Sequence, residues 1–457
     1  MHTPSADGDS RLSLWLRVRE YAVPPSMIET ATARRHAGDW AGACAAAGID
    51  VDLRLRTLAR THGRELAARI RSDLRHLAPD LLRWHMPRVA PDGLLRPGLT
   101  LALARYDHPD PVYLVVRTPP AWADGGQRIS LALWDTSRLG ADARHHPHPR
   151  PAPRFRLDLH RHLWDARRTG ELRVRSGADR PPPGSEPPGP LPPGHHCAVD
   201  RWADEARIVL RDAGRTTGSV AVRTGGGHRL VVTLPDDDGG PVPASAARVT
   251  PAAGAGSVAA LPVLPDAATH VLPDLALLRA GAIGAGRLHP LVADALVPDR
   301  AAAGPPRPPE RTGQPEFVQC RGARHRIGLV GGVLTPLDHA PDEIRRERLL
   351  AELTGTPLPC LRAVDRAHRQ PDCLTGVRER LDHGDTAGAL AVVENLLGPG
   401  ARLPGGPLRD ELEAVARRRI TYGLYRSGLS GPAPAWLLPA RPRPAGRRGH
   451  PRHATDG

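Results

Sequence analysis

The chain has 457 residues, no lysine, and a formal net charge of +14 from 63 basic and 49 acidic residues. Because P-loop NTPases, protein kinases, pyridoxal enzymes and Schiff-base aldolases all need a lysine amine, the composition excludes these four classes. Every basic side chain is an arginine, which grips carboxylates and phosphates but cannot act as a base near neutral pH. The chain also has one asparagine and two phenylalanines, so the missing lysine indicates GC-rich codon usage rather than a function.

The length and the prolines predict several domains. A chain of 457 residues exceeds the size at which one hydrophobic core usually stops growing, and its 51 prolines and 47 glycines occur in clusters. The five cysteines are too widely spaced for a disulfide framework, which favours a reducing, cytoplasmic location. Residues 1–10 show no signal-peptide pattern, and no apolar run is long enough to span a membrane, so we expect no membrane partner.

The first predicted domain, residues 11–175, begins with helices between positions 13 and 86. Ser26 and Glu29 have the spacing of a capping box, and Asp39 is placed to cap a short helix that Gly48 would end. The pattern then changes to period two, which predicts a three-stranded antiparallel meander. A further helix is expected around 157–168.

Two Pro-rich linkers separate the remaining predicted domains. The predicted helices, strands and linkers together indicate an α+β protein. In it, helical hairpins pack with small antiparallel sheets, joined by Pro-rich linkers. The boundaries are a linker at 176–199, a small α+β unit at 200–298, a linker at 299–315, a β-meander followed by a helical bundle or hairpin at 316–430, and a basic, disordered tail at 431–457.

One short pattern occurs twice, at 38–43 and 384–389. Each copy reads Gly-Asp-x-Ala-Gly-Ala where we expect the turn of a helical hairpin. The pattern resembles the turns of tetratricopeptide-type helix pairs, but two isolated copies cannot form a solenoid. Convergent capping chemistry is therefore favoured over a domain duplication.

A cysteine and histidine set in the last domain is the candidate metal site. Cys320 and His325 are predicted on adjoining strands of a hairpin, and thiolate and imidazole are the ligands zinc prefers. The set lacks a Cys-x-x-Cys pair, so ordinary core cysteines are the simpler interpretation and a structural zinc is the alternative. The other candidates are Cys360, His368 and Cys373, with His339 and His383 close in sequence.

The segment 157–162, Leu-Asp-Leu-His-Arg-His, is the enzyme candidate. It resembles the strand-end His-x-His of metal-dependent amidohydrolases, which would make the chain a metal-dependent hydrolase. No set of β/α-barrel strands follows it, so we expect solvated histidines instead. No catalytic residue and no cofactor are assigned from the sequence.

Clustered arginines raise the possibility of nucleic-acid binding through phosphate contacts. Exposed aromatic side chains, on which single strands stack, are scarce, so a solvated helix face and a disordered tail are the favoured interpretation. The candidate residues are Arg64, Arg71 and Arg75 on a helix and Arg441, Arg443, Arg447 and Arg448 in the tail.

Three stretches are similar to uncharacterised proteins of high-GC actinobacteria, and this resemblance implies no activity. They are residues 19–43, 320–328 and 381–385. We therefore expect a cytosolic, non-enzymatic protein-interaction or accessory factor, with another cytosolic protein as partner. The alternatives are an arginine-mediated nucleic-acid-binding protein and a metal-dependent hydrolase.

Overall fold

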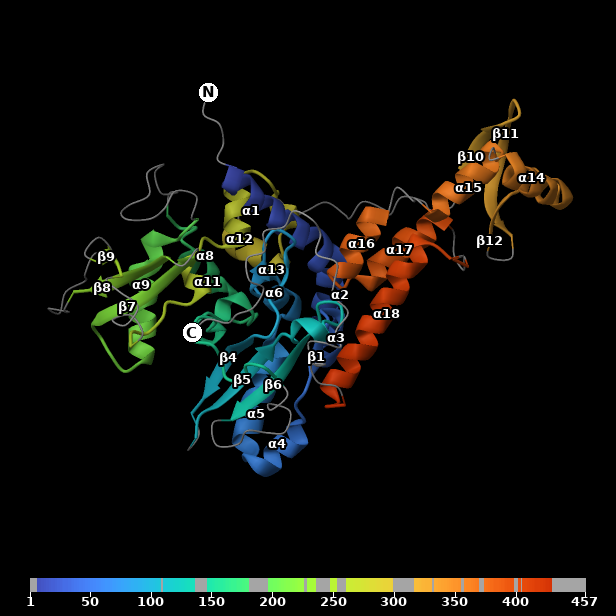
Figure 1. Ribbon diagram of the computed structural model, residues 1–457. Helices are drawn as coiled ribbons and strands as arrows, with labels where there is room; N and C mark the ends of the chain where they lie inside the picture. Colours follow the sequence, from blue (N-terminus) through green and yellow to red (C-terminus); the bar gives the residue numbers. More distant parts are fainter. Residues whose placement is uncertain are drawn as a thin grey trace, which may run out of the picture. The chain divides into compact units, whose positions relative to one another are not determined.

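The computed structural model confirms the α+β class and divides the chain into two compact units (Figure 1). Unit 1 comprises residues 1–124, 128–302 and 424–457, and unit 2 comprises 125–127 and 303–423. The structure describes residues 6–107, 110–135, 146–180, 196–225, 228–235, 247–252, 260–298, 316–330, 333–354, 357–369, 374–397, 402–403 and 405–429. In these segments no helix combines the length and apolar character needed to cross a bilayer.

The N-terminal helices form where the sequence places them. Asp39 caps α3 by accepting a hydrogen bond of 2.8 Å from the backbone of Gly42. The predicted capping box is wrong, because α2 begins at Pro25 and no side chain caps it. The elements are α1 (Ala6–Arg17), a π-helical turn (Val18–Ala22), α2 (Pro25–His36), α3 (Trp40–Ala46), α4 (Leu55–Thr61), α5 (Arg64–His76) and α6 (Pro79–Trp84).

The predicted meander is confirmed as β4 (Thr100–Tyr106), β5 (Val112–Arg117) and β6 (Ile129–Asp135). A fourth strand that the sequence did not predict, β1 (Ile49–Val51), pairs in parallel with β6, and the sheet order is β1-β6-β5-β4. Three residues are too few to show a period of two, so β1 has no local signal. A two-stranded ribbon, β2 (Arg88–Val89) and β3 (Leu94–Leu95), lies before the sheet in sequence.

His146 supplies a pH-dependent contact to the chain after β5. Its Nε2 donates to the carbonyl of Thr118 at 3.0 Å, and its Nδ1 accepts from the backbone of His148. The second contact needs an unprotonated Nδ1, and burial lowers the pKa of His146 to about 4. The unfolded chain binds this proton near pH 6.5, so the stabilisation present above pH 6.5 is lost as the pH falls to 4, by about 3 kcal/mol.

We therefore expect His146→Gln to reduce the pH dependence of unfolding. Urea unfolding of wild type and variant at pH 7 and pH 4.5 measures it. The free-energy difference between the two proteins should be largest at pH 7 and shrink at pH 4.5. A constant difference at both pH values would contradict the assignment.

The segment 157–168, predicted as a helix, instead forms 3-10 turns at Leu157–Leu159 and Arg161–Leu163. The next strands confirm the predicted hairpin at 219–234 and add a third strand, β9, with α9 packed on the sheet. The remaining elements of unit 1 are a 3-10 turn at Ala121–Ala123, another at Thr169–Glu171, α8 (Leu172–Ser176), α9 (Val199–Asp212), β7 (Gly218–Gly225), β8 (His228–Leu234), β9 (Arg248–Pro251), α11 (Asp266–Thr269), α12 (Pro273–Arg279), a 3-10 turn at Ala285–Arg287 and α13 (Pro290–Leu296).

The core explains why two predicted domains share one unit. Apolar residues of α12 and α13, among them Leu275, Leu277 and Val292, join the buried cluster formed by the N-terminal helices and the first sheet. The sheet β7-β8-β9 and α9 form a separate cluster around Trp202. Residues 200–298 thus contribute to both clusters, which a boundary at 199 does not anticipate.

Unit 2 contains the predicted meander and helices, plus one helix that was not predicted. The three-stranded sheet has the order β10-β11-β12, and α15 packs against it (Figure 1). The elements are β10 (Glu316–Cys320), β11 (Ala323–Val330), β12 (Val333–Pro336), α14 (Pro341–Thr354), α15 (Pro359–Arg369), α16 (Leu374–Asp382), α17 (Thr386–Leu397) and α18 (Pro407–Arg426).

The repeated Gly-Asp pattern closes two helical hairpins with the same bonds. In α16–α17, Asp385 accepts a hydrogen bond from the backbone of Gly388 and one from Arg380, each at 2.9 Å. Asp39 makes the corresponding bonds in α2–α3 to Gly42 at 2.8 Å and Arg34 at 2.9 Å. A Cβ at Gly388 would lie 2.1 Å from the Asp385 carboxylate, so a glycine is required there. The same capping bonds are sufficient to explain why this sequence pattern occurs twice.

Replacing Asp385 by alanine should destabilise unit 2 by about 1 kcal/mol, since an N-cap is lost. Urea unfolding followed by a probe of unit 2 measures the effect. Asp410→Ala, an exposed change on α18, is the control and should have a smaller effect. Equal losses of unfolding free energy in the two variants would show that Asp385 does not act as a cap.

Candidate metal centre

The hairpin β10–β11 places the first two candidate ligands. Cys320 ends β10 opposite Ala323, and the two-residue loop between them has positive φ at both Arg321 and Gly322. This loop conformation matches the twist of the strands and forms a tight two-residue hairpin turn. His325 follows on β11, two positions after Ala323. It therefore lies on the same face of the sheet as Ala323 and its partner Cys320.

Two further ligands come from elements outside that hairpin. His339 lies in the turn between β12 and α14, and Cys360 lies in the first turn of α15. Cys360 is fully buried, and Val364, one turn further along α15, packs in one cluster with Ile327 and Leu334 of the sheet. The helix that the sequence did not predict is therefore the element that delivers the second thiol.

The four side chains form a compact set. One ligand atom from each of Cys320, His325, His339 and Cys360 lies within 4.8 Å of the others. Nδ1 of His325 and Nε2 of His339 are 2.7 Å apart. Zinc bonds of about 2.3 Å to sulfur and about 2.0 Å to nitrogen separate tetrahedral ligands by about 3.3–3.8 Å. Small side-chain adjustments would thus bring all four atoms onto one zinc ion.

The outer contacts orient His339 as a ligand. Its Nδ1 lies 3.3 Å from the carboxylate of Glu343, which leaves Nε2 directed at the other three ligands. Glu343 in turn accepts a hydrogen bond of 2.8 Å from Arg321 in the hairpin loop. A carboxylate behind a histidine fixes its tautomer and is the usual arrangement around protein-bound zinc.

The donor set indicates a structural site. Two thiols and two imidazoles fill the four positions of a tetrahedral zinc, whereas a catalytic zinc keeps one position open. Cys320, Cys360 and His339 are buried. Burial, followed by the hydrogen bond to Cys320, raises the pKa of Cys360 to about 12, so the metal-free thiol is protonated and zinc binding would release that proton.

The structure thus brings together three of the five predicted metal candidates, Cys320, His325 and Cys360, and adds His339. His368 belongs to α15, but its side chain lies outside the described part of the chain. Cys373 also lies outside the described residues. His383 is buried and lies 3.9 Å from Glu379, apart from the four-residue set.

The His-x-His segment is a structural feature in the described region. His160 and His162 are buried, so the prediction of solvated histidines is wrong. Nδ1 of His160 lies 2.9 Å from the carbonyl of Arg156, and Nε2 lies 3.1 Å from Glu205. Both nitrogens of His160 are therefore engaged, and among the described residues no metal-ligand group forms around this segment.

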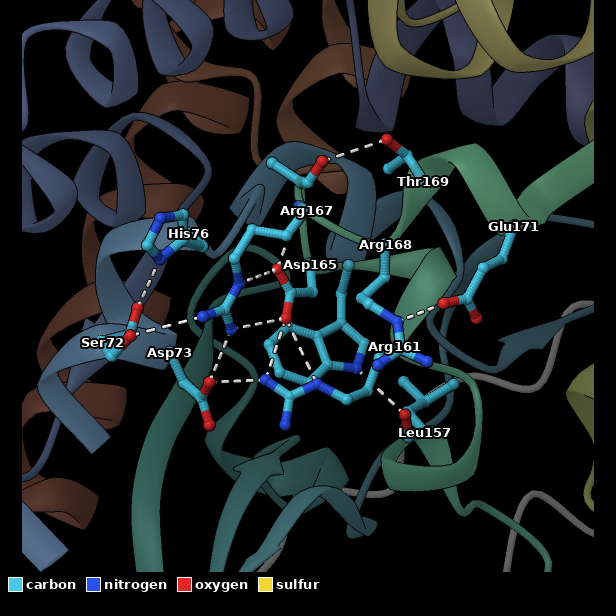
Figure 2. Close-up of polar contacts among 12 residues, drawn as sticks. Ser72, Asp73, His76, Leu157, Arg161, Asp165, Arg167, Arg168, Thr169 and Glu171 are labelled. Carbon is cyan, nitrogen blue, oxygen red and sulfur yellow. Dashed lines mark hydrogen bonds and ion pairs between the residues drawn. The ribbon is translucent and has the colours of Figure 1, made fainter. Parts of the chain in front are cut away.

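Arg161 within the His-x-His segment, two residues that follow it and Asp73 of α5 form an ion-pair network. Figure 2 shows the carboxylates of Asp165 and Asp73 between the guanidinium groups of Arg161 and Arg167. Burial would raise the pKa of Asp165, but hydrogen bonds from Arg167 and Arg161 outweigh it and lower the pKa. Because Tyr106 also donates to Asp73 at 2.7 Å, the network joins α5, β4 and the turn at 161–163.

The structure describes three of the seven arginines predicted as nucleic-acid contacts. Arg64, Arg71 and Arg75 are exposed on α5, opposite the buried Ile70 and Leu74. Neither these three arginines nor the exposed Arg56 and Arg60 of α4 form an ion pair within the segments that the structure covers. Arg441, Arg443, Arg447 and Arg448 lie outside the described residues.

Comparison of the chain with protein-family models, curated proteins and solved structures finds no match. The chemistry of the four-residue metal site is therefore the basis on which a function is proposed.

Proposed function

We propose that this chain is a cytosolic, non-enzymatic interaction protein whose unit 2 is stabilised by a structural zinc ion. The observation that supports it is the closed set of Cys320, His325, His339 and Cys360, with ligand atoms within 4.8 Å. Small sheets with few apolar residues gain folding free energy from such a metal. A filled coordination shell serves stability and not hydrolysis.

The partner surface in this proposal is the outer face of α14. Leu349 and Leu353 lie one turn apart and are 57% and 86% exposed, with Leu350 also exposed between them. Leucines at this spacing form an apolar stripe of the kind that docks into a groove of another protein. Ile344 is the buried residue by which α14 packs on its own unit.

The zinc ligands would hold this surface in place. His339 immediately precedes α14, and Glu343 in its first turn contacts both His339 and Arg321. Arg321 also forms an ion pair with Glu347 one turn further along. Loss of the metal would free His339 and so loosen α14, which links zinc content to partner binding.

The test is an affinity purification from the native cytosol with wild type, Leu349→Ser/Leu353→Ser and Arg345→Ala. Arg345 is an exposed residue of the same helix and is the matched control. A partner recovered by wild type and Arg345→Ala, and lost with the leucine variant, supports the proposal. A monomeric wild type that recovers no partner would remove it.

A nucleic-acid role is the second candidate, because the exposed arginines of α4 and α5 lack carboxylate partners in the described structure. It requires duplex binding that weakens steeply with salt. The triple change Arg64→Gln/Arg71→Gln/Arg75→Gln should then reduce the slope of log K against log salt by about 3. Binding that is absent, or insensitive to salt, excludes this role.

A further inference from the structure

A cavity of about 300 Å³ lies inside unit 1, at a distance in sequence from every zinc ligand. Residues from α1, the segment after α6, the chain before β4, the segment 154–157 and α11 line it. This volume lies within the range of small-molecule sites. The inference drawn from this cavity does not depend on the function proposed above.

The charges around the cavity do not balance. Five arginines and one carboxylate, Asp266, line it. Arg154 pairs with Asp266 at 2.6 Å, and Arg156 pairs with Asp158 and Asp212, so these two arginines are neutralised. Three cations remain: Arg11, Arg88 and Arg96.

None of these three arginines has a carboxylate within ion-pair distance in the part of the chain that is described. Arg88 donates to the carbonyls of Gly93 and Arg83, while its buried Nε has no hydrogen-bond partner. Burial lowers the pKa of Arg11, and burial together with Arg154 lowers the pKa of Arg96. Desolvated like charges of this kind are stabilised by an anion.

His85 adds a further unused polar atom. Its Nε2 is buried and makes no hydrogen bond in the described structure. Burial, followed by the charges of Arg19, His289 and Arg88, lowers the pKa of His85 to about 3, so the ring is neutral near pH 7. A neutral imidazole can donate one hydrogen bond to an oxyanion without adding charge.

Most of the other residues that line the cavity are apolar, with His270 as a further polar one. Trp15, Leu101, Leu157 and Leu163 face it, and the ring of Phe155 lies 6.0 Å from the guanidinium of Arg96. A ligand that fits therefore carries a compact anionic group and an apolar or aromatic body. Three uncompensated cations favour a dianionic phosphate over a monoanionic carboxylate, and guanidinium groups suit phosphate oxygens.

We propose that this cavity binds a small phosphate monoester with an apolar or aromatic body, held by Arg11, Arg88 and Arg96. Nε of Arg88 and Nε2 of His85 would supply hydrogen bonds to the phosphate oxygens. Phe155 and Trp15 would contact the organic part. No bond is made or broken in this proposal, which concerns binding alone.

Isothermal titration of the full chain with phenyl phosphate tests the site. We expect measurable binding that weakens at high salt, weaker binding of benzoate and of inorganic phosphate, and none of phenol. Arg11→Gln and Arg96→Gln, made separately, should each weaken phenyl phosphate binding at least tenfold.

Arg173→Gln, at an exposed position of α8, is the matched control and should bind as wild type does. Thermal unfolding of each variant confirms that it is folded, and the two cavity variants provide independent tests. The proposal is overturned if folded wild type fails to bind phenyl phosphate, if either folded cavity variant binds it as wild type does, or if benzoate binds equally well.

Discussion

Purified from the cells in which it is naturally made, the protein should contain about one zinc ion per chain, and Cys360→Ser should contain none. The metal should be essential for unit 2, because structural zinc contributes about 10–16 kcal/mol in small metal-binding modules. Cys360 is buried between α15 and the sheet, so its loss removes both a ligand and a core contact. Elemental analysis gives the metal content, and hydrogen exchange of β10–β12 gives the stability.

Cys197→Ser is the control, since Cys197 belongs to unit 1 and is not one of the four ligands. It should retain the zinc and the slow exchange of β10–β12. Chelation of wild type should reproduce the rapid exchange of Cys360→Ser, and added zinc should reverse it. The site is refuted if wild type has no stoichiometric metal and a chelator leaves exchange unchanged.

Asp274→Ala should destabilise unit 1 by about 3–5 kcal/mol. Asp274 and Arg19 are 0% and 2% exposed and form an ion pair of 3.1 Å. Asp274 also accepts a hydrogen bond of 2.7 Å from Trp84, whose ring lies 3.8 Å from the Arg19 guanidinium. Removing the carboxylate leaves a buried cation without its counter-charge, which is the costly case.

Urea unfolding, followed by the fluorescence of the buried tryptophans, measures this loss. Asp274→Asn keeps an acceptor for Trp84 but removes the charge, so its cost should be intermediate. Glu65→Ala, at an exposed position of α5, should cost less than 1 kcal/mol. A loss below 1 kcal/mol for Asp274→Ala would show that Arg19 does not depend on this partner.

The parts of the fold that the sequence predicted are those with local signals. The Asp39 cap, the turn at Gly384 and the meanders depend on residues within a few positions of one another. Their alternation of apolar and polar residues or their capping side chains can be recognised without knowledge of the rest of the chain. The helix from Pro341 was predicted for the same reason.

The failures lie where distant contacts override local preference. The turn at 157–163 has a helical sequence pattern, but contacts of His160 with Glu205 and of Arg161 with Asp73 favour 3-10 turns. The strand β1 exists only because β6 pairs with it. The helix α15 was not predicted from the sequence, and it packs against the sheet β10-β11-β12.

The sequence and the tertiary structure likewise determine different things about function. The missing lysine excludes whole classes of chemistry, because the absence of a side chain holds in any fold. The net charge of +14 shows that arginines outnumber carboxylates, but it does not say which arginines line a cavity. The zinc site was decided by tertiary structure, because Cys320 and Cys360 come from separate elements without the short spacing of a zinc knuckle. Only packing of α15 and the turn at His339 onto one hairpin brings their four ligand atoms together.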